Sequence, residues 1–282
     1  MKTGLVMEGG AMRGMFTAGV TDVFMENDIT FDGAIGVSAG AAFGCNYKSG
    51  QIGRAIRYNK KFCNDPRYVS IRSLLKTGDL YNEQFAYHEL PYNLDKFDAA
   101  AFSANPMEFY VVCTDADTGK PVYHRCEKGN AEDFEWIRAS ASMPMVSRLI
   151  HIDGKALSDG GTADSIPIRY FEQIGYEKNV VILTQPDGFV KQRNSFLPLL
   201  RVALRKQPKL LETLADRHNV YNETLTYLKK REQAGKAFII QPPEALNIGA
   251  VSRKPEELER VYQIGRNEAI GRLEQLRKFI NA

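Results

Sequence analysis

A serine between small residues is the first feature of this sequence that could perform chemistry. Ser38 stands in GVSAG, residues 36–40, after the apolar run FDGAIGV and before the small-residue run AGAAFGCNY. A nucleophilic serine on a sharp strand-to-helix turn needs small residues two positions before and after it, and Gly36 and Gly40 meet that need. A helix beginning there would place N–H groups and partial positive charge beside an oxyanion. An ordinary turn could have the same composition, so the context must decide.

A glycine-rich segment, EGGAMRG at residues 8–14, separates the first apolar run from the first helical pattern. Its glycines permit close backbone approach and positive φ angles, which suits a loop of free N–H groups beside Ser38. One such donor to an oxyanion contributes about 3–4 kcal/mol in other enzymes. Arg13 adds a positive charge. A nucleotide-binding loop is disfavoured because the glycines do not form G-x-G-x-x-G and no Walker lysine follows.

No histidine in the sequence is an evident candidate for the base that would accept the Ser38 proton. Histidine is the usual partner of a nucleophilic serine, but none of the four lies in a glycine-rich turn, and surface or core-edge positions suit them better. Asp159, followed by two glycines in SDGGTADSIPI, could sit exposed in a tight turn and act as the base. An ordinary Asp-Gly turn is the open alternative. The histidines are His88, His124, His151 and His218.

Strand and helix patterns alternate along the chain that must position these residues. Strands are predicted at 3–7, 31–37, 179–184 and 237–241, with hairpins at 107–125 and 148–160. Helices are predicted at 15–27, 39–47, 130–142, 167–174 and from about 255, with irregular helix over 51–98 and mostly helix up to 232. This alternation predicts a three-layer α/β fold, a central and mostly parallel sheet flanked by helices. No linker or repeat divides the chain, so we expect one domain over 1–282.

The composition argues against several classes of function. The formal net charge of the 282 residues is +3, too small to indicate a nucleic-acid partner. Four widely spaced cysteines without a C-x-x-C pair predict neither a zinc site nor a disulfide framework, and favour a cytoplasmic setting. No apolar run reaches the roughly 18 residues that cross a bilayer. We expect no metal and no cofactor, and the oligomeric state stays open.

A basic segment covers residues 189–231, with ten Lys and Arg against three Asp and Glu. Its apolar residues have helical spacing, so it could lie on an anionic membrane surface and form a lid over the site. Packing of its apolar face on the protein core is an equally good interpretation. Peripheral membrane contact is therefore an expectation that the sequence leaves open.

Three glycine-containing segments together resemble the patatin-like phospholipase family. EGGAMRG, GVSAG and SDGG, in this order, are similar to the family's oxyanion loop, nucleophile elbow and Asp-Gly-Gly turn. Further similarities are DADTG at 115–119, IRASASMP at 137–144 and DGGTADSIPI at 159–168. The resemblance covers about residues 3–185, and a helical C-terminal extension follows over about 190–282.

This resemblance implies a lipid acyl hydrolase, a phospholipase, lysophospholipase or esterase, with a Ser-Asp dyad and an acyl-enzyme intermediate. The dyad would be Ser38 and Asp159. The family often has a third glycine where this chain has Ala11, whose side chain tolerates fewer backbone angles. An acyltransferase using the same acyl-enzyme and a non-catalytic lipid-binding protein are the alternatives. The implied oxyanion hole is Gly9, Gly10 and Ala11, supported by Arg13, Gly14, Gly36, Gly40, Gly160 and Gly161.

Overall fold

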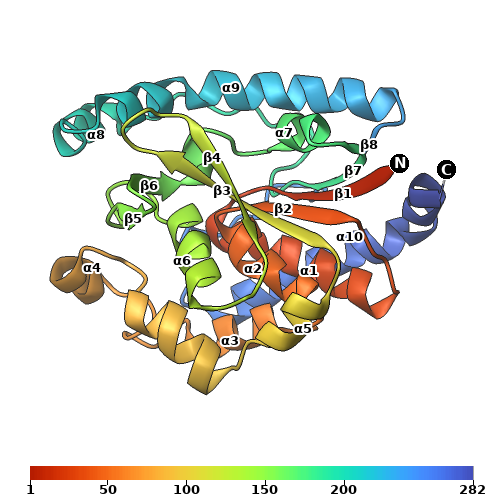
Figure 1. Cartoon of the computed structure of the whole chain (residues 1–282), viewed down its shortest axis with the longest axis horizontal. Coiled ribbons are helices and arrows are strands. Elements are labelled where there is room, and N and C mark those ends of the chain that lie inside the picture. The colour runs from red at the N-terminus through yellow and green to blue at the C-terminus, as the bar shows by residue number, and fades with distance from the viewer. Residues whose placement is uncertain (282) are drawn as a thin grey trace.

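A central sheet between two layers of helices dominates the computed structural model, which describes residues 1–281 (Figure 1). Five of its strands are parallel, in the spatial order β3-β2-β1-β7-β8. Three short strands, β4, β5 and β6, extend the sheet in antiparallel fashion from β3. The predicted fold class is confirmed. The bounds are β1 Lys2–Met7, β2 Gly33–Val37, β3 Glu108–Asp115, β4 Pro121–Cys126, β5 Ile150–Ile152, β6 Lys155–Asp159, β7 Tyr176–Ile182 and β8 Ala237–Ile240.

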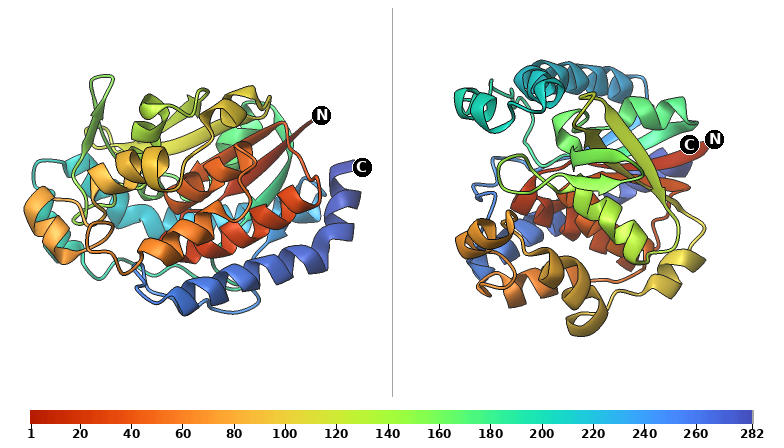
Figure 2. Two further views of the ribbon diagram at one scale, coloured as in Figure 1. Left: turned by 90° about the horizontal axis from the view of Figure 1, so that it is seen from below. Right: turned by 60° about the vertical axis from the view of Figure 1, so that its left-hand side comes forward.

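Helices cover both faces of the sheet, as Figures 1 and 2 show. The parallel strands are therefore covered on both sides, and every residue of β2 and β8 is buried, which explains their continuous apolar runs. On one face lie α7 Ile168–Gln173, α8 Leu197–Ala203 and α9 Pro208–Gln233. On the other lie α1 Gly14–Glu26, α2 Ala39–Lys48, α3 Arg54–Phe62, α5 Ala99–Ala104, α6 Ala131–Ser140 and α10 Pro255–Asn281.

Residues 51–98, for which the sequence predicts irregular helix, contain α3, the short helix α4 Ile71–Thr77 and a wide, π-type helix, η2 Gln84–Leu94. Pro91 lies inside η2, where it would normally end an α-helix. The C-terminal extension supplies one strand besides its helices, because β8 pairs with β7 at the edge of the sheet. None of the helices in residues 1–281 combines the length and the apolar character needed to cross a membrane.

Two strands that approach from opposite directions end next to each other on β3. Along one edge, β3 pairs with β2 only as far as Val112, which lies opposite Val37. From Cys113 on, the same edge pairs with the antiparallel strand β6, whose last residue, Asp159, lies opposite Cys113. The other edge of β3 is occupied by β4 throughout. The end of β2 and the end of β6 therefore meet, which brings the residue after Val37 beside Asp159.

Candidate active site

Ser38 occupies the strained turn between β2 and α2. Its backbone angles, φ 54° and ψ −120°, are unfavourable for a residue with a Cβ and persist only where the surroundings enforce them. The neighbouring glycines explain how: a Cβ at Gly36 would lie 2.5 Å from the Gly40 carbonyl oxygen. A Cβ at Gly40 would lie 2.4 Å from the Met7 carbonyl oxygen. The turn is thus packed too closely to admit any larger residue at either position.

A buried serine that has no assigned role in the sequence holds this turn in place. The Ser38 N–H donates to Ser140 Oγ at 2.9 Å, and Ser140 Oγ donates to the Val112 carbonyl at 2.6 Å. Val112 is the last residue of β3 opposite β2, so its carbonyl faces the point where β2 leaves the sheet. Ser140 therefore joins the nucleophile turn to the sheet where the strand pairing changes. It belongs to the IRASASMP segment, but nothing in its sequence context distinguishes it from its neighbours.

The exposed position that the sequence predicts for Asp159 is wrong: this last residue of β6 is almost fully buried, because β6 pairs with β3 there. Its Oδ1 accepts the Gly161 N–H at 2.7 Å, while its own carbonyl accepts from Thr114 Oγ1 at 2.8 Å. Burial raises the pKa of the Asp159 carboxyl, whereas a hydrogen bond from the Ser38 side chain, the Arg217 guanidinium and the Gly161 N–H oppose that rise. The Ser38 side chain thus faces the Asp159 carboxylate.

Gly160 and Gly161 are required by the turn that follows Asp159. A Cβ at Gly160 would lie 2.0 Å from the Val112 carbonyl oxygen, the same atom that Ser140 contacts. A Cβ at Gly161 would lie 3.0 Å from Asp159 Oδ1 and 3.1 Å from Arg217 Nη2. Both glycines thus leave room for the carboxylate and for its contacts.

The loop after β1 runs directly over Ser38. A Cβ at Gly9 would lie 3.1 Å from Ser38 Cβ, and one at Gly10 would lie 2.6 Å from Thr184 Oγ1. Ala11 adopts φ 49°, so the position where the family often has glycine takes a left-handed conformation despite its side chain. No hydrogen bond found within residues 1–281 uses the N–H of these three residues as its donor. The loop can therefore offer free N–H groups beside the nucleophile.

Arg13 and Gly14 continue this loop into α1. The Arg13 Nε donates weakly to Thr184 Oγ1 at 3.4 Å, next to the end of β7. A Cβ at Gly14 would lie 2.9 Å from Ala39 Cβ, so the starts of α1 and α2 pack closely. This contact fixes the loop against the helix that begins after Ser38.

An apolar pocket begins at Ser38 and Ala11 and extends between α2, α6 and η2. Carboxyl ends of parallel strands are where ligands bind in open α/β sheets, and Ser38 stands at such an end. Aromatic and aliphatic side chains form most of the pocket wall, which suits an apolar chain rather than a charged group. They include Phe43, Tyr58, Leu90, Phe134, Ile137 and Met143.

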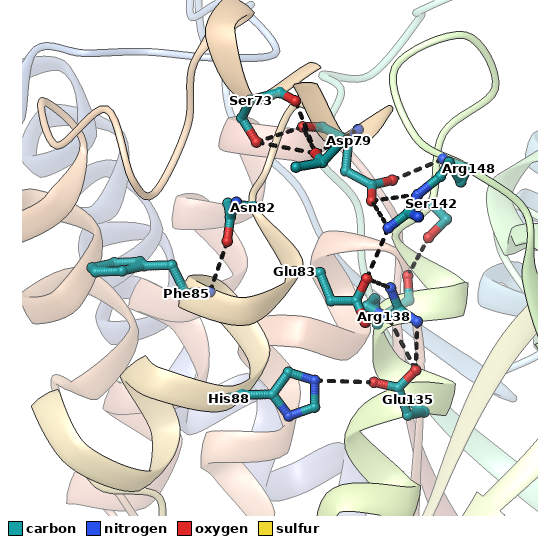
Figure 3. A network of polar contacts seen from close by, with 11 residues as sticks. Ser73, Asp79, Asn82, Glu83, Phe85, His88, Glu135, Arg138, Ser142 and Arg148 are labelled. Carbon is teal, nitrogen blue, oxygen red and sulfur yellow. Dashed lines mark hydrogen bonds and ion pairs between the residues drawn. The ribbon is translucent and has the colours of Figure 1, made fainter. Parts of the chain in front are cut away.

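An ion-pair network fastens η2 and the loop before it onto α6, beside this pocket (Figure 3). Arg138 pairs with Glu83 and with Glu135, each at 2.6 Å. Arg148 pairs with Asp79 at 2.8 Å and with Glu83 at 3.0 Å. Positive and negative groups alternate along the network, so its charges are largely compensated internally. We interpret it as the structural support of the pocket wall.

None of the four histidines hydrogen-bonds to Ser38 or Asp159 in the part of the chain that the structure describes. The closest polar approach of His88 is to Glu135 at 3.6 Å in the network just described, and His124 stacks on Trp136 with ring centroids 4.0 Å apart. His151 is exposed on β5, and His218 lies on α9.

Within residues 1–281, two groups of side chains could in principle share a metal ion, and neither of these groups includes Ser38 or Asp159. Glu83, His88 and Glu135 belong to the ion-pair network, where arginines already neutralise the carboxylates. In the group of His124, Cys126 and Asp133, the Asp133 carboxylate already accepts two backbone N–H groups. Burial also raises the pKa of the Cys126 thiol, which disfavours the thiolate that a metal needs.

Comparison with known proteins decides the family. The sequence model described as patatin-like phospholipase matches residues 5–172, more than half of the chain. The chain belongs to the patatin-like phospholipase family. The resemblance expected from the three turns is thus confirmed, and family membership supports lipid hydrolase activity. A second sequence model, a domain of unknown function named DUF6363, matches residues 207–281, which include α9, β8 and α10.

Several relatives share this patatin-like sequence. The uncharacterized protein YjjU of Escherichia coli is 30% identical, over 93% of this chain and 74% of YjjU. The lysophospholipase nte1 of Aspergillus oryzae is 22% identical, over 97% of this chain but 18% of that protein. The uncharacterized NTE family protein Rv2565 of Mycobacterium tuberculosis is 29% identical, over 58% of this chain and 27% of its own. The solved structure of VipD from Legionella pneumophila is similar with a TM-score of 0.48 and 13% identity, over 97% of this chain and 67% of VipD.

Proposed function

We propose that the protein is a lipid acyl hydrolase whose catalytic residues are Ser38 and Asp159. The observation that carries this proposal is the meeting of β2 and β6 on one edge of β3. It supports a dyad because it brings together Ser38, which follows β2 in a strained backbone conformation, and the buried Asp159, which ends β6. The free N–H groups of Gly9, Gly10 and Ala11 lie beside them.

In the proposed mechanism, Ser38 Oγ attacks the ester carbonyl carbon while Asp159 accepts its proton. The oxyanion would be held by the N–H groups of residues 9–11, and its collapse would expel the alcohol, which takes the proton back from Asp159. A water molecule, deprotonated by Asp159, would then cleave the acyl-enzyme and release the fatty acid. The raised pKa supports this role because a more basic carboxylate accepts the serine proton more readily.

The apolar pocket supports a lipid as the substrate. It opens at Ser38 and has a mainly aliphatic and aromatic wall, so the acyl chain of an ester bound there would be removed from water. We also propose that the protein works at a membrane surface, with which it makes peripheral contact. That part rests on the exposed apolar side chains of α4 and α8.

The dyad is tested by Ser38→Ala and Asp159→Asn, with the exposed Ser195→Ala as the matched control. Each dyad variant should lower kcat for a lipid ester by about 10³-fold or more, because both groups act in one step. A fluorophosphonate probe should label Ser38 in the parent protein and in the control. Near-normal hydrolysis by either dyad variant would show that the dyad is wrong.

Thermal unfolding at pH 8 separates loss of chemistry from loss of fold. Because the pKa of Asp159 is raised on folding, its ionised form destabilises the folded state at pH values above that pKa. The neutral, isosteric Asp159→Asn should therefore unfold at or above the temperature of the parent. Product analysis with an added acceptor alcohol distinguishes an acyltransferase, and a non-catalytic lipid-binding protein would leave Ser38 unlabelled.

A further inference from the structure

Tyrosines form part of the wall of the pocket that begins at Ser38. Tyr58 is on α3, Tyr68 and Tyr81 lie before and after α4, and Tyr87 is on η2. Three of the rings pack edge to face in a row: the centroids of Tyr58 and Tyr68 are 6.5 Å apart, and those of Tyr68 and Tyr81 are 5.3 Å apart. The largely apolar pocket thus carries a group of phenols on one wall, and a plain alkyl chain cannot hydrogen-bond to them.

Two of these phenols, on Tyr81 and Tyr87, have no hydrogen-bond partner within residues 1–281. Tyr68 differs, because its Oη donates to Asn59 Oδ1 at 3.1 Å. Tyr81 and Tyr87 are partly buried and pack against the main hydrophobic core. Burial raises the pKa of both above the usual value of about 10, so they stay neutral hydroxyls that can donate and accept. A partly buried hydroxyl without a partner favours any bound group that pairs with it.

The charged side chains of the same pocket are already paired, as Figure 3 shows for most of them. Arg138 pairs with Glu83 at 2.6 Å, and Asp79 pairs with Arg148 at 2.8 Å. The Arg54 guanidinium donates to a backbone carbonyl at 2.6 Å and to a side-chain amide oxygen at 2.8 Å. A charged group on a ligand would therefore compete with existing pairs. An uncharged oxygen, such as that of a hydroxyl or a carbonyl group, would only have to meet the phenols.

The position of Tyr87 relates the phenols to the dyad. Tyr87 lines the same pocket as Ser38. Burial is the main cause of the raised pKa of Tyr87, and the negative charge of Asp159 adds to it, so this phenol lies near the dyad. Tyr87 in turn adds to the raised pKa of Tyr81, so the two phenols are neighbours. An acyl chain that extends from Ser38 into the pocket would therefore pass both of them.

We propose that Tyr81 and Tyr87 select an acyl chain that carries a hydroxyl group over a plain alkyl chain. This inference rests on the proposed function and narrows its substrate class to esters of hydroxylated fatty acids. A hydroxyl group can accept from one phenol and donate to the other, so one substituent can satisfy both. A plain chain would exclude water from the two phenols and leave them unpaired. The apolar remainder of the wall still buries the methylene groups of either chain.

The test compares nitrophenyl octanoate with nitrophenyl esters of hydroxyoctanoic acids whose hydroxyl group is near the carboxyl end, in the middle or at the far end of the chain. Each kcat/KM is divided by the rate constant for alkaline hydrolysis of the same ester, which corrects for intrinsic reactivity. The parent should prefer at least one hydroxylated ester to the plain ester by about 5-fold or more, the usual effect of leaving one uncharged polar group unpaired. No preference at any position of the hydroxyl group would overturn the proposal.

Phenylalanine variants show whether the phenols cause this preference. The double variant Tyr81→Phe, Tyr87→Phe removes only the two hydroxyls, and Tyr92→Phe is the matched control, 41% exposed on the same helix as Tyr87 and not part of the pocket wall. The double variant should lose the preference for the hydroxylated ester and hydrolyse the plain ester at least as well as the parent, because no polar group is left unpaired there. An equal loss on plain and hydroxylated esters would assign the phenols to the ester group that all substrates share and would overturn the proposal.

Binding measurements separate a failure of this inference from a failure of the proposed function. If no ester is hydrolysed and Ser38 is not labelled, the proposed function fails. Calorimetry on Ser38→Ala, which leaves the esters intact, then still tests the pocket. The preferred hydroxylated ester should bind about 5-fold or more tightly than the plain ester, and the difference should vanish when Tyr81→Phe and Tyr87→Phe are added. Equal binding of the two esters to Ser38→Ala would overturn the inference even if the parent is a hydrolase.

Discussion

Asp159 would have to activate a serine without a histidine, and its surroundings indicate how. Burial makes the ionised carboxylate less favourable than in water and raises its pKa, while Ser38, Arg217 and Gly161 lower the pKa and limit that rise. The balance yields a carboxylate more basic than an ordinary aspartate. A base of this kind accepts a proton more readily than an exposed carboxylate. It is also protonated, and therefore inactive as a base, in moderately acidic solution.

This balance predicts the pH dependence of activity. The ionised form of Asp159 is the base, so kcat/KM should fall as pH drops through the raised pKa, at a pH above the value of about 4 typical of an exposed aspartate. Arg217→Gln should move this acidic limb to higher pH, because the guanidinium lowers the pKa. Lys230→Met, at an exposed position on α9, serves as the control. An acidic limb near pH 4, or one unmoved by Arg217→Gln, would contradict the assignment of Asp159.

Residue-level prediction from sequence works where a backbone conformation demands a residue type. The glycines around Ser38 and after Asp159 indicate close backbone contacts, so these turns could be located from the sequence alone. Ser140 could not, because its importance comes from the Val112 carbonyl at the place where β2 and β6 meet. Arg217 could not be singled out either, since a charge count over 189–231 does not say which cation lies near Asp159.

At the scale of elements, strands and their hairpins were easier to predict than the helical segment 51–98. The hairpin turn at Asp153 and Gly154 has positive φ at both residues, which the Asp-Gly pair signals directly. Nothing comparable marks η2: its π-type hydrogen bonding accommodates Pro91, a residue that normally indicates the end of a helix. The pocket wall is therefore the least predictable part of the candidate site.

Glycines bring the backbones of α1 and α10 into close contact. A Cβ at Gly19 would lie 2.1 Å from the Tyr262 carbonyl oxygen, and one at Gly265 would lie 2.1 Å from the Phe16 carbonyl oxygen. The two helices thus touch through their backbones at these positions, and α10 from the C-terminal region supports α1 behind the oxyanion loop.

Gly265→Ala should lower the free energy of unfolding by about 1–3 kcal/mol, because the methyl group forces the helices apart. Gly271→Ala on the same helix, where a Cβ meets no atom within 4 Å, is the control. It should raise the free energy of unfolding by up to about 1 kcal/mol through higher helix propensity. Urea unfolding measures both. Equal responses of the two variants would rule out the close contact.

Two short helices far apart in sequence, α4 and α8, lie toward the same end of the molecule (Figures 1 and 2). Both expose apolar side chains. On α4, Leu75 is 83% exposed, and on α8, Val202 is 70% exposed. The sequence left two interpretations of segment 189–231, packing on the protein core and contact with a membrane. Burial supports core packing for α9, and membrane contact of α8 stays a prediction. On α9, Leu210 and Leu228 are buried in the protein core, whereas α8 turns apolar residues outward. The outward residues of both helices are Ile71, Leu75, Phe196, Leu199 and Val202.

The charges around these helices indicate which surface they would meet. No Asp or Glu occurs in residues 66–78 or 188–211, but both stretches carry several Lys and Arg. Apolar side chains surrounded by cations suit an anionic membrane, into whose surface they could insert. Met145, 41% exposed, lies in a loop next to the chain that follows α4. Leu80 N donates a hydrogen bond to the Val146 carbonyl of this loop at 2.8 Å. Leu80 and Val146 both line the apolar pocket. A membrane-bound molecule would thus hold its pocket close to the lipids.

Vesicle binding tests this arrangement. The parent should sediment with phosphatidylcholine vesicles that contain an anionic lipid, and the double variant Leu199→Ser, Val202→Ser should lose about 10-fold or more of this binding, since it removes two inserting side chains. Charge reversal by Arg201→Glu and Arg205→Glu should have a similar effect on anionic vesicles. Ile270→Ser, 52% exposed on α10, is the apolar control and should bind like the parent. Because α8 is outside the dyad, all variants should hydrolyse a soluble ester at the parental rate. Unchanged vesicle binding by both α8 variants would place the lipid contact elsewhere and leave α8 as a structural helix with an exposed apolar face.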